Sequence, residues 1–224
     1  MNYIKHRLEK LTEVIDNGKF FREPMKLYYV MNGIAAFAVP AFFIKILTQL
    51  WSTLQYLNGW SKFMTELSLV LVLIWLIVLA YCALLYWLDR KKNLNKCVRI
   101  GDSIVAIPTI AHYIQCAGEC FGIMLGLSVI GASFILYIFG LLSGFGLFGG
   151  ADGFSGYLLF FLIATIVLLV IILTTFLVCY PIVVWSHVIG EKLRIKAQIA
   201  NDVRDVSDIH RAATMTVEAE NNVQ

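Results

Sequence analysis

The sequence predicts an all-α, polytopic membrane protein with four transmembrane helices and a cytoplasmic amphipathic helix at each end. Apolar residues make up 59% of the 224 residues, and the mean hydropathy is +0.77. These residues fall in four long blocks, and roughly 20 apolar residues are enough to cross a bilayer as a helix. The connections between the blocks are short, so the length of the chain is taken up by four spans and leaves no separate soluble domain.

The basic residues predict which side of the membrane each connection occupies. Of the 18 Lys and Arg residues, six lie in 5–26, five in 90–99 and five in 192–211. An excess of Lys and Arg marks cytoplasmic segments. Four crossings with both termini in the cytoplasm follow, in a cytoplasmic (inner) or plasma membrane. No cleavable leader is expected, because the first 26 residues are charged and lack a small-residue cleavage pattern.

Residues 1–26 are expected to form the N-terminal cytoplasmic segment. Ile4, Leu8, Leu11 and Ile15 repeat at helical spacing among charged residues, which is typical of an amphipathic helix. Two interpretations stay open. The helix either anchors on the membrane surface or packs against the cytoplasmic face of the protein itself.

The first two spans are expected to play different roles. Span 1 (27–50) is rich in small residues, including Gly33, and Pro40 is expected to kink it. Span 2 (65–88) has no glycine or proline and consists mainly of bulky Leu, Ile and Val. Because bulky side chains suit lipid contact better than close helix packing, span 2 is expected at the lipid perimeter.

The second half of the chain contains spans 3 (118–142) and 4 (157–189). Residues 98–117 before span 3 are interpreted in two ways: as an extension of the span 3 helix beginning near Pro108, or as an interfacial or re-entrant segment. Span 4 is also expected to face lipid. After Gly190 a polar helix is expected to continue over 191–213 in the cytoplasm, followed by a disordered tail over 214–224.

Three glycines at four-residue spacing, Gly118, Gly122 and Gly126, indicate the main packing surface. At this spacing they form a groove along one helix face, where another helix can approach closely. Together with Gly33 of span 1, they predict helix packing that supports self-association or docking into a larger complex.

A polar stripe shares this face of span 3. Gln115, Glu119, Ser133 and Tyr137 project near the glycines, and an ionisable residue in a span often marks a functional site. If copies of span 3 surrounded an axis, this stripe would line a pathway. The alternative is that Glu119 lies in the headgroup layer, solvated or paired with Arg99 or Lys96.

Four side chains are weak candidates for a metal or haem site. His112, Cys116 and Cys120 lie four residues apart on one helix face, and His187 is expected at a similar depth in span 4. Histidine and cysteine bind soft or borderline metals. However, residues four apart on one helix rarely surround a tetrahedral ion, so no metal site is assigned.

Taken together, the sequence predicts no enzyme, no cofactor and no nucleic-acid partner. No serine lies in a nucleophile elbow, and no two carboxylates converge within the spans. The first functional hypothesis is a self-associating structural or regulatory subunit of a membrane complex, with the cytoplasmic helices as the partner surface and the lipid bilayer around it. The alternatives are an oligomeric ion channel or small-solute transporter lined by span 3, and a membrane metal or haem redox protein.

Overall fold

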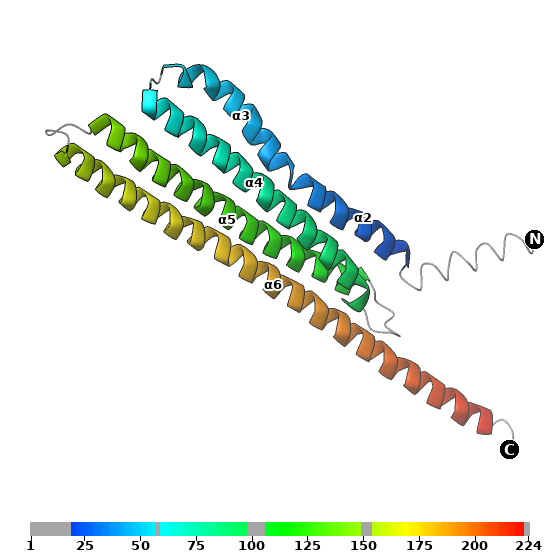
Figure 1. The fold of residues 1–224 in the computed structure, drawn as a ribbon. Helices are drawn as coiled ribbons and strands as arrows, with labels where there is room; N and C mark the ends of the chain where they lie inside the picture. The colour runs from blue at the N-terminus through cyan, green and yellow to red at the C-terminus, as the bar shows by residue number, and fades with distance from the viewer. Residues whose placement is uncertain (1–18, 57–58, 98–105, 149–153, 222–224) are drawn as a thin grey trace, which may run out of the picture.

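The computed structural model describes residues 19–56, 59–97, 106–148 and 154–221, and all regular structure in these ranges is helical (Figure 1). The elements are α2 (Lys19–Ala35), α3 (Ala38–Leu54), α4 (Gly59–Asn93), the short 3-10 helix η1 (Leu94–Cys97), α5 (Ala106–Phe148) and α6 (Phe154–Asn221). Four segments are long and apolar enough to cross a membrane: Phe21–Ser52, Gly59–Asn93, Ala106–Gly144 and Ser155–Met215. The predicted multi-pass helical architecture is therefore confirmed. The helix expected over residues 1–16 lies outside the described residues.

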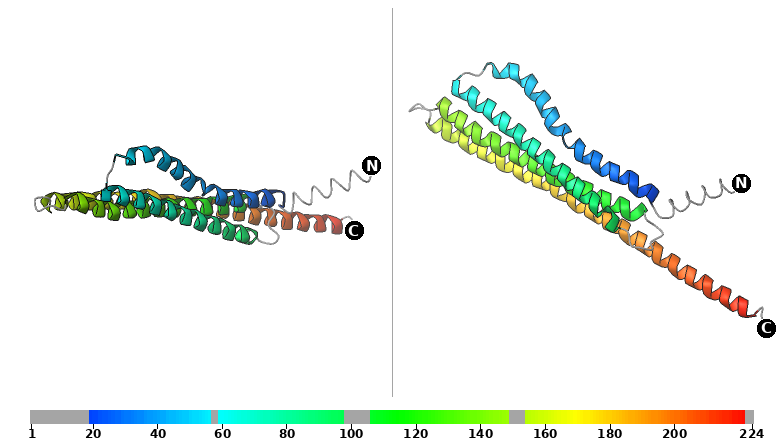
Figure 2. Two further views of the ribbon diagram at one scale, coloured as in Figure 1. Left: turned by 45° about the horizontal axis from the view of Figure 1, so that its top comes forward. Right: turned by 45° about the vertical axis from the view of Figure 1, so that its right-hand side comes forward.

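The helices lie in a row and do not close around an axis. α2 and α3 pack on α4, and α4 packs on α5. α5 in turn packs on α6 along most of the length of α5 (Figures 1 and 2). The chain enters and leaves this row at the same end, where α2 begins and α4 ends in Arg90, Lys91 and Lys92. We call this the basic end of the bundle.

Span 1 is two helices and not one kinked helix. α2 ends at Ala35 and α3 starts at Ala38, so the chain bends between them (Figure 1). Pro40 has no N–H to donate to the carbonyl of Ala36. The amide of Val39 donates to that carbonyl instead, at 3.4 Å, in a tighter turn. The proline thus breaks the helix one turn before its own position.

α4 corrects part of the expectation that span 2 lies at the lipid perimeter: its other face keeps Ile74, Tyr81 and Leu85 exposed, but the helix also packs closely on its neighbours. One face of α4 is buried along its whole length, and α4 lies between α2 and α3 on one side and α5 on the other. The buried residues are Met64, Ser68, Val72, Leu76, Leu79, Ala80, Ala83 and Trp87. Bulky residues did not exclude packing, because this face also carries the small side chains of Ser68, Ala80 and Ala83.

α5 resolves part of the question about residues 98–117. The helix begins at Ala106, so the residues from 106 to 117 extend span 3, while 98–105 lie outside the described residues. Pro108 is in the first turn, where a backbone N–H would have no acceptor within the helix, so the absence of this group in proline costs no hydrogen bond. At 1.5 Å per residue, the 43 residues of α5 measure about 64 Å, roughly twice the hydrocarbon thickness.

α6 replaces three expected segments with one helix. Span 4, the cytoplasmic helix over 191–213 and most of the tail expected to be disordered form a continuous helix of 68 residues from Phe154 to Asn221. Gly190 does not end the helix, because its backbone packs against the Gln115 side chain of α5. α6 therefore continues past the basic end of the bundle as a single rod (Figure 1).

Candidate functional site

The three glycines of span 3 lie against α6 of the same chain. A Cβ added at Gly118 would overlap Ser186, and one at Gly122 would lie 2.5 Å from Val183 Cγ2 and 3.1 Å from the Cys179 carbonyl oxygen. At Gly126 the same atom would lie 3.6 Å from Cys179 Sγ. We call this contact the glycine seam. It is filled within one chain, whereas the sequence led us to expect a second copy or another subunit there.

Gly33 is also covered within the chain. A Cβ at this position would meet Leu84 Cδ1 at 2.9 Å and Trp87 Cβ at 3.4 Å, so α2 and α4 touch closely here. Both small-residue faces expected to support self-association are therefore occupied by neighbouring helices of the same molecule.

Glu119 is the centre of a charged cluster that joins three helices. Its Oε2 accepts hydrogen bonds from Tyr86 Oη at 2.5 Å and from Arg90 at 3.0 Å, both on α4. Its Oε1 lies 2.8 Å from Nε2 of His187 on α6. The Glu119 side chain is 18% exposed, so these groups replace most of its contact with water. Arg99 lies outside the described residues, and Lys96 is exposed; the cation paired with Glu119 is Arg90.

The rest of the polar stripe is directed mainly at α6. Gln115 is buried against Gly190, and Tyr137 Oη lies 2.8 Å from Thr165 Oγ1. Ser133 is half-buried. Because α6 covers Gln115 and Tyr137, these side chains serve helix contacts in the single chain.

His112 belongs to an aromatic cluster at the basic end. Tyr29 Oη lies 2.6 Å from His112 Nδ1, and the Tyr29 ring packs on Trp87 and Tyr113 at centroid distances of 5.2 and 5.5 Å. Sequence reasoning missed this pair, because nothing local connects residues 83 positions apart. The only sequence signal was the aromatic enrichment near the start of span 1.

The four weak metal candidates are distributed over different environments. Cys116 Sγ lies 3.6 Å from His112 Nδ1, but His187 contacts Glu119 and Cys120 faces α4. Among the residues that the structure describes, no three His, Cys, Asp or Glu side chains come together in a way that could hold a metal ion. The two histidines also contact different side chains, which gives no support to a shared haem.

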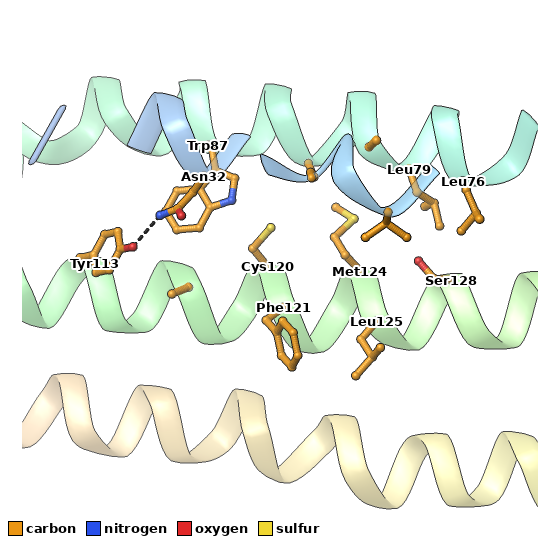
Figure 3. Close-up of a pocket in the computed structure, with 15 residues that line it drawn as sticks. Asn32, Leu76, Leu79, Trp87, Tyr113, Cys120, Phe121, Met124, Leu125 and Ser128 are labelled. Carbon is orange, nitrogen blue, oxygen red and sulfur yellow. Dashed lines mark hydrogen bonds between the residues drawn. The ribbon is translucent and has the colours of Figure 1, made fainter. Parts of the chain in front are cut away.

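An apolar groove of about 360 Å³ opens between α2, α3, α4 and α5 (Figure 3). Its floor is buried and includes Leu79, Ala83 and Trp87, whereas Val39 and Phe121 at the edge are more than half exposed. One end is polar, because Asn32 Nδ2 donates a hydrogen bond of 2.5 Å to Tyr113 Oη. We call this feature the lateral groove.

The part of α6 beyond Gly190, residues 191–221, has two different faces. Ala197 and Asn201 are buried on the side of the helix that also carries Gly190 and packs on α5. On the opposite side, large apolar residues are each more than half exposed: Ile195, Ile199, Val203, Val206 and Ile209. We call this set the rod stripe.

Comparisons with protein-family models, with curated proteins and with solved structures gave no match to this chain. The features that bear on function are the glycine seam, the Glu119 cluster, the lateral groove and the rod stripe.

Proposed function

We propose that the protein is a structural or regulatory subunit of a membrane complex that presents the rod stripe of α6 to an amphipathic helix of a cytoplasmic partner. The observation that carries this proposal is the exposure of the apolar rod stripe on a helix that continues past the bundle. The 61 residues of Ser155–Met215 measure about 92 Å, about three times the hydrocarbon thickness, so the charged distal part lies outside the bilayer.

The spacing of the rod stripe supports a helical partner. At 100° per residue, Ile195, Ile199, Val203, Val206 and Ile209 fall within about 120° of the helix surface. An apolar face of this width on a helix in water normally packs against another element. The five residues recur at i, i+4, i+8, i+11 and i+14, and helix-in-groove contacts use such spacings of three and four residues.

Charge favours a different protein over a second copy. The part nearest the bundle has a net positive charge from Lys192, Arg194 and Lys196 against Glu191. The next part has a net negative charge, because Arg204, which pairs with Asp208 at 4.0 Å, leaves Asp202 and Asp205 unbalanced. Two copies in one membrane would extend their rods in the same direction and so place like charges side by side. A partner helix with acidic residues near the membrane and basic residues farther away would complement both parts.

Photo-crosslinking in native membranes tests this proposal. A photoreactive residue replaces Val203 within the stripe or, as the matched control, Arg204 on the opposite face of the full-length protein. We expect one discrete adduct with another protein at position 203, none at 204, and loss of the adduct when Val206→Asp is added. An adduct with a second copy, or equal labelling at both positions, would overturn the proposed partner.

A second function, transport of an ion or small solute, is favoured by one specific observation. Glu119, Arg90 and His187 place a carboxylate, a guanidinium and an imidazole together within candidate spans, and ionisable groups at such depth often belong to ion pathways. Reconstituted protein should then conduct, and Glu119→Gln should change its ion preference while the exposed Glu191→Gln should not. Liposomes that stay tight at every voltage and pH would remove this candidate.

A further inference from the structure

The lateral groove lies inside the membrane-spanning part of the molecule. Its lining comes from α2, α3, α4 and α5, all within candidate spans. Figure 3 shows Cys120 and Met124 of α5 directed toward α4, where Leu76, Leu79 and Trp87 form the facing wall. Because the groove opens to the side, the material that reaches it first in a bilayer is lipid.

Small side chains create the space. Ala36, Ala80, Ala83 and Ala117 line the groove where longer residues would fill it. The break before Pro40 also contributes, since α3 leaves the direction of α2 and diverges from α4 (Figure 1). The groove thus follows from the sequence of the spans and from the bend between α2 and α3.

We infer that the lateral groove holds one acyl chain of an anionic phospholipid, with the headgroup at the basic end. The lining residues extend along α5 from Tyr113 to Ser128, a rise of about 22 Å over 15 residues. This length suits a single extended acyl chain. A volume of about 360 Å³ is at the small end of the roughly 300–1,000 Å³ of ligand pockets, which fits one chain better than a whole lipid.

The polar end of the groove supports the orientation. Asn32 and Tyr113 form the hydrogen-bonded pair there, and these groups suit the ester region where an acyl chain joins its headgroup. Lys26 is six residues before Asn32 on α2 and pairs with Glu23 at 2.6 Å, and Lys91 is four residues after Trp87 on α4. Both lysines lie about 6–9 Å nearer the basic end along their helices, where two cations and one carboxylate leave a net positive charge. Cations at this depth attract anionic headgroups.

Photoactivatable phospholipids test the inference. The full-length protein is reconstituted in vesicles that contain a phosphatidylglycerol with a diazirine in its acyl chain or, in parallel, the matching phosphatidylcholine. We expect phosphatidylglycerol to label the buried floor of α4 around Leu79–Ala83, and phosphatidylcholine to label it much less. Exposed residues of α6 such as Leu173 and Phe176 are the internal reference, which both lipids should label equally.

A variant in which a larger side chain fills the groove is compared with a control variant that has the same substitution outside it. Ala83→Leu should abolish labelling of the floor and leave the α6 reference unchanged, whereas Ala41→Leu, at an exposed alanine of α3, should change neither. A floor that remains unlabelled in the unsubstituted protein, or that both lipids label equally, would overturn the inference.

A second measurement decides the question if Ala83→Leu fails to fold. Trp87 is 5% exposed and lines the groove, so a bilayer that merely surrounds the protein has little contact with its ring. In a variant that keeps Trp87 alone among the tryptophans, brominated phosphatidylglycerol should quench its fluorescence more than brominated phosphatidylcholine. Lys26→Gln combined with Lys91→Gln should remove that difference, and equal quenching by both lipids would count against the anionic headgroup.

Discussion

Glu119 of α5 and His187 of α6 approach to 2.8 Å between the carboxylate Oε1 and the imidazole Nε2. The same carboxylate accepts hydrogen bonds from Tyr86 and Arg90 of α4. One side chain therefore joins the three longest helices, although α4 and α6 have little direct contact with each other.

Replacement of Glu119 by Gln is expected to destabilise the bundle. The amide keeps the shape but removes the negative charge that balances Arg90, and hydrogen bonds to charged groups contribute about 1.5–3 kcal/mol each. We expect the free energy of unfolding in detergent to fall by about 2 kcal/mol. The control is Glu191→Gln, at an exposed position one turn after His187. This substitution should change the free energy of unfolding by less than about 0.5 kcal/mol. Equal stability of the two variants would contradict the bridging role.

The glycine seam predicts a contrast between two glycines of the same helix. Gly122→Ala would place a methyl group 2.5 Å from Val183 and 3.1 Å from a backbone oxygen of Cys179, so α6 would have to move. Such overpacking typically costs about 1–3 kcal/mol. Gly140 has nothing within 4 Å of the same atom, and Gly140→Ala should stabilise α5 by up to about 1 kcal/mol through helix propensity. Thermal unfolding of both variants checks the sign of each effect.

The buried pair of Tyr29 and His112 predicts a second contrast, between adjacent tyrosines. Tyr29→Phe removes a hydrogen bond of 2.6 Å and leaves the Nδ1 atom of His112 without that partner in the protein interior. Cys116 Sγ, 3.6 Å from the same nitrogen, remains as a weak partner, so the expected loss is about 1 kcal/mol, the usual net contribution of one hydrogen bond. Tyr28 is 56% exposed, and Tyr28→Phe should be nearly neutral. If chemical denaturation gave the same midpoint for both variants, the tyrosine and histidine would not be paired as described.

The break between α2 and α3 should depend on Pro40. In Pro40→Ala, residue 40 regains an N–H that can donate to the Ala36 carbonyl, which favours one continuous helix. Spin labels at the exposed positions 28 and 50 should then move apart toward about 33 Å, the rise of 22 helical residues. Double electron–electron resonance measures this distance in the variant and in the parent protein. An unchanged distance would show that tertiary packing, and not the proline, sets the bend.

The sequence predicted the helical class and the approximate positions of four spans, because long apolar blocks have few structural solutions in a membrane. It also identified Gly118, Gly122 and Gly126 as a close-packing surface, because the reason is local: glycine lets a neighbouring helix approach. What the sequence does not contain is the identity of that neighbour. Spacing on one helix is equally compatible with α6 of the same chain and with a second copy.

The interior position of α4 and the full length of α6 were missed for related reasons. Span 2 lacks glycine, but its contact with α5 uses a glycine on the other helix, since the indole of Trp75 lies over Gly131 and its Nε1 donates to the Leu127 carbonyl at 3.1 Å. The helix expected over 191–213 continues span 4 without a break, and Gly190 at the junction packs against Gln115 of α5. In both cases the sequence of one helix does not identify the helix that packs against it.

An engineered disulfide can show whether the glycine seam joins α5 to α6 within one molecule. A Cβ at position 126 would lie 3.8 Å from Cys179 Cβ, which is a typical separation across a disulfide of about 3.8 Å. Gly126→Cys is made in a protein that keeps Cys179 and has its other cysteines replaced, and it is oxidised in the membrane. Mass spectrometry should find a disulfide that links the two peptides within one chain, with no change in oligomeric mass. A disulfide-linked dimer of two chains, or no disulfide between these positions, would show that α5 and α6 of one molecule do not meet at the glycine seam.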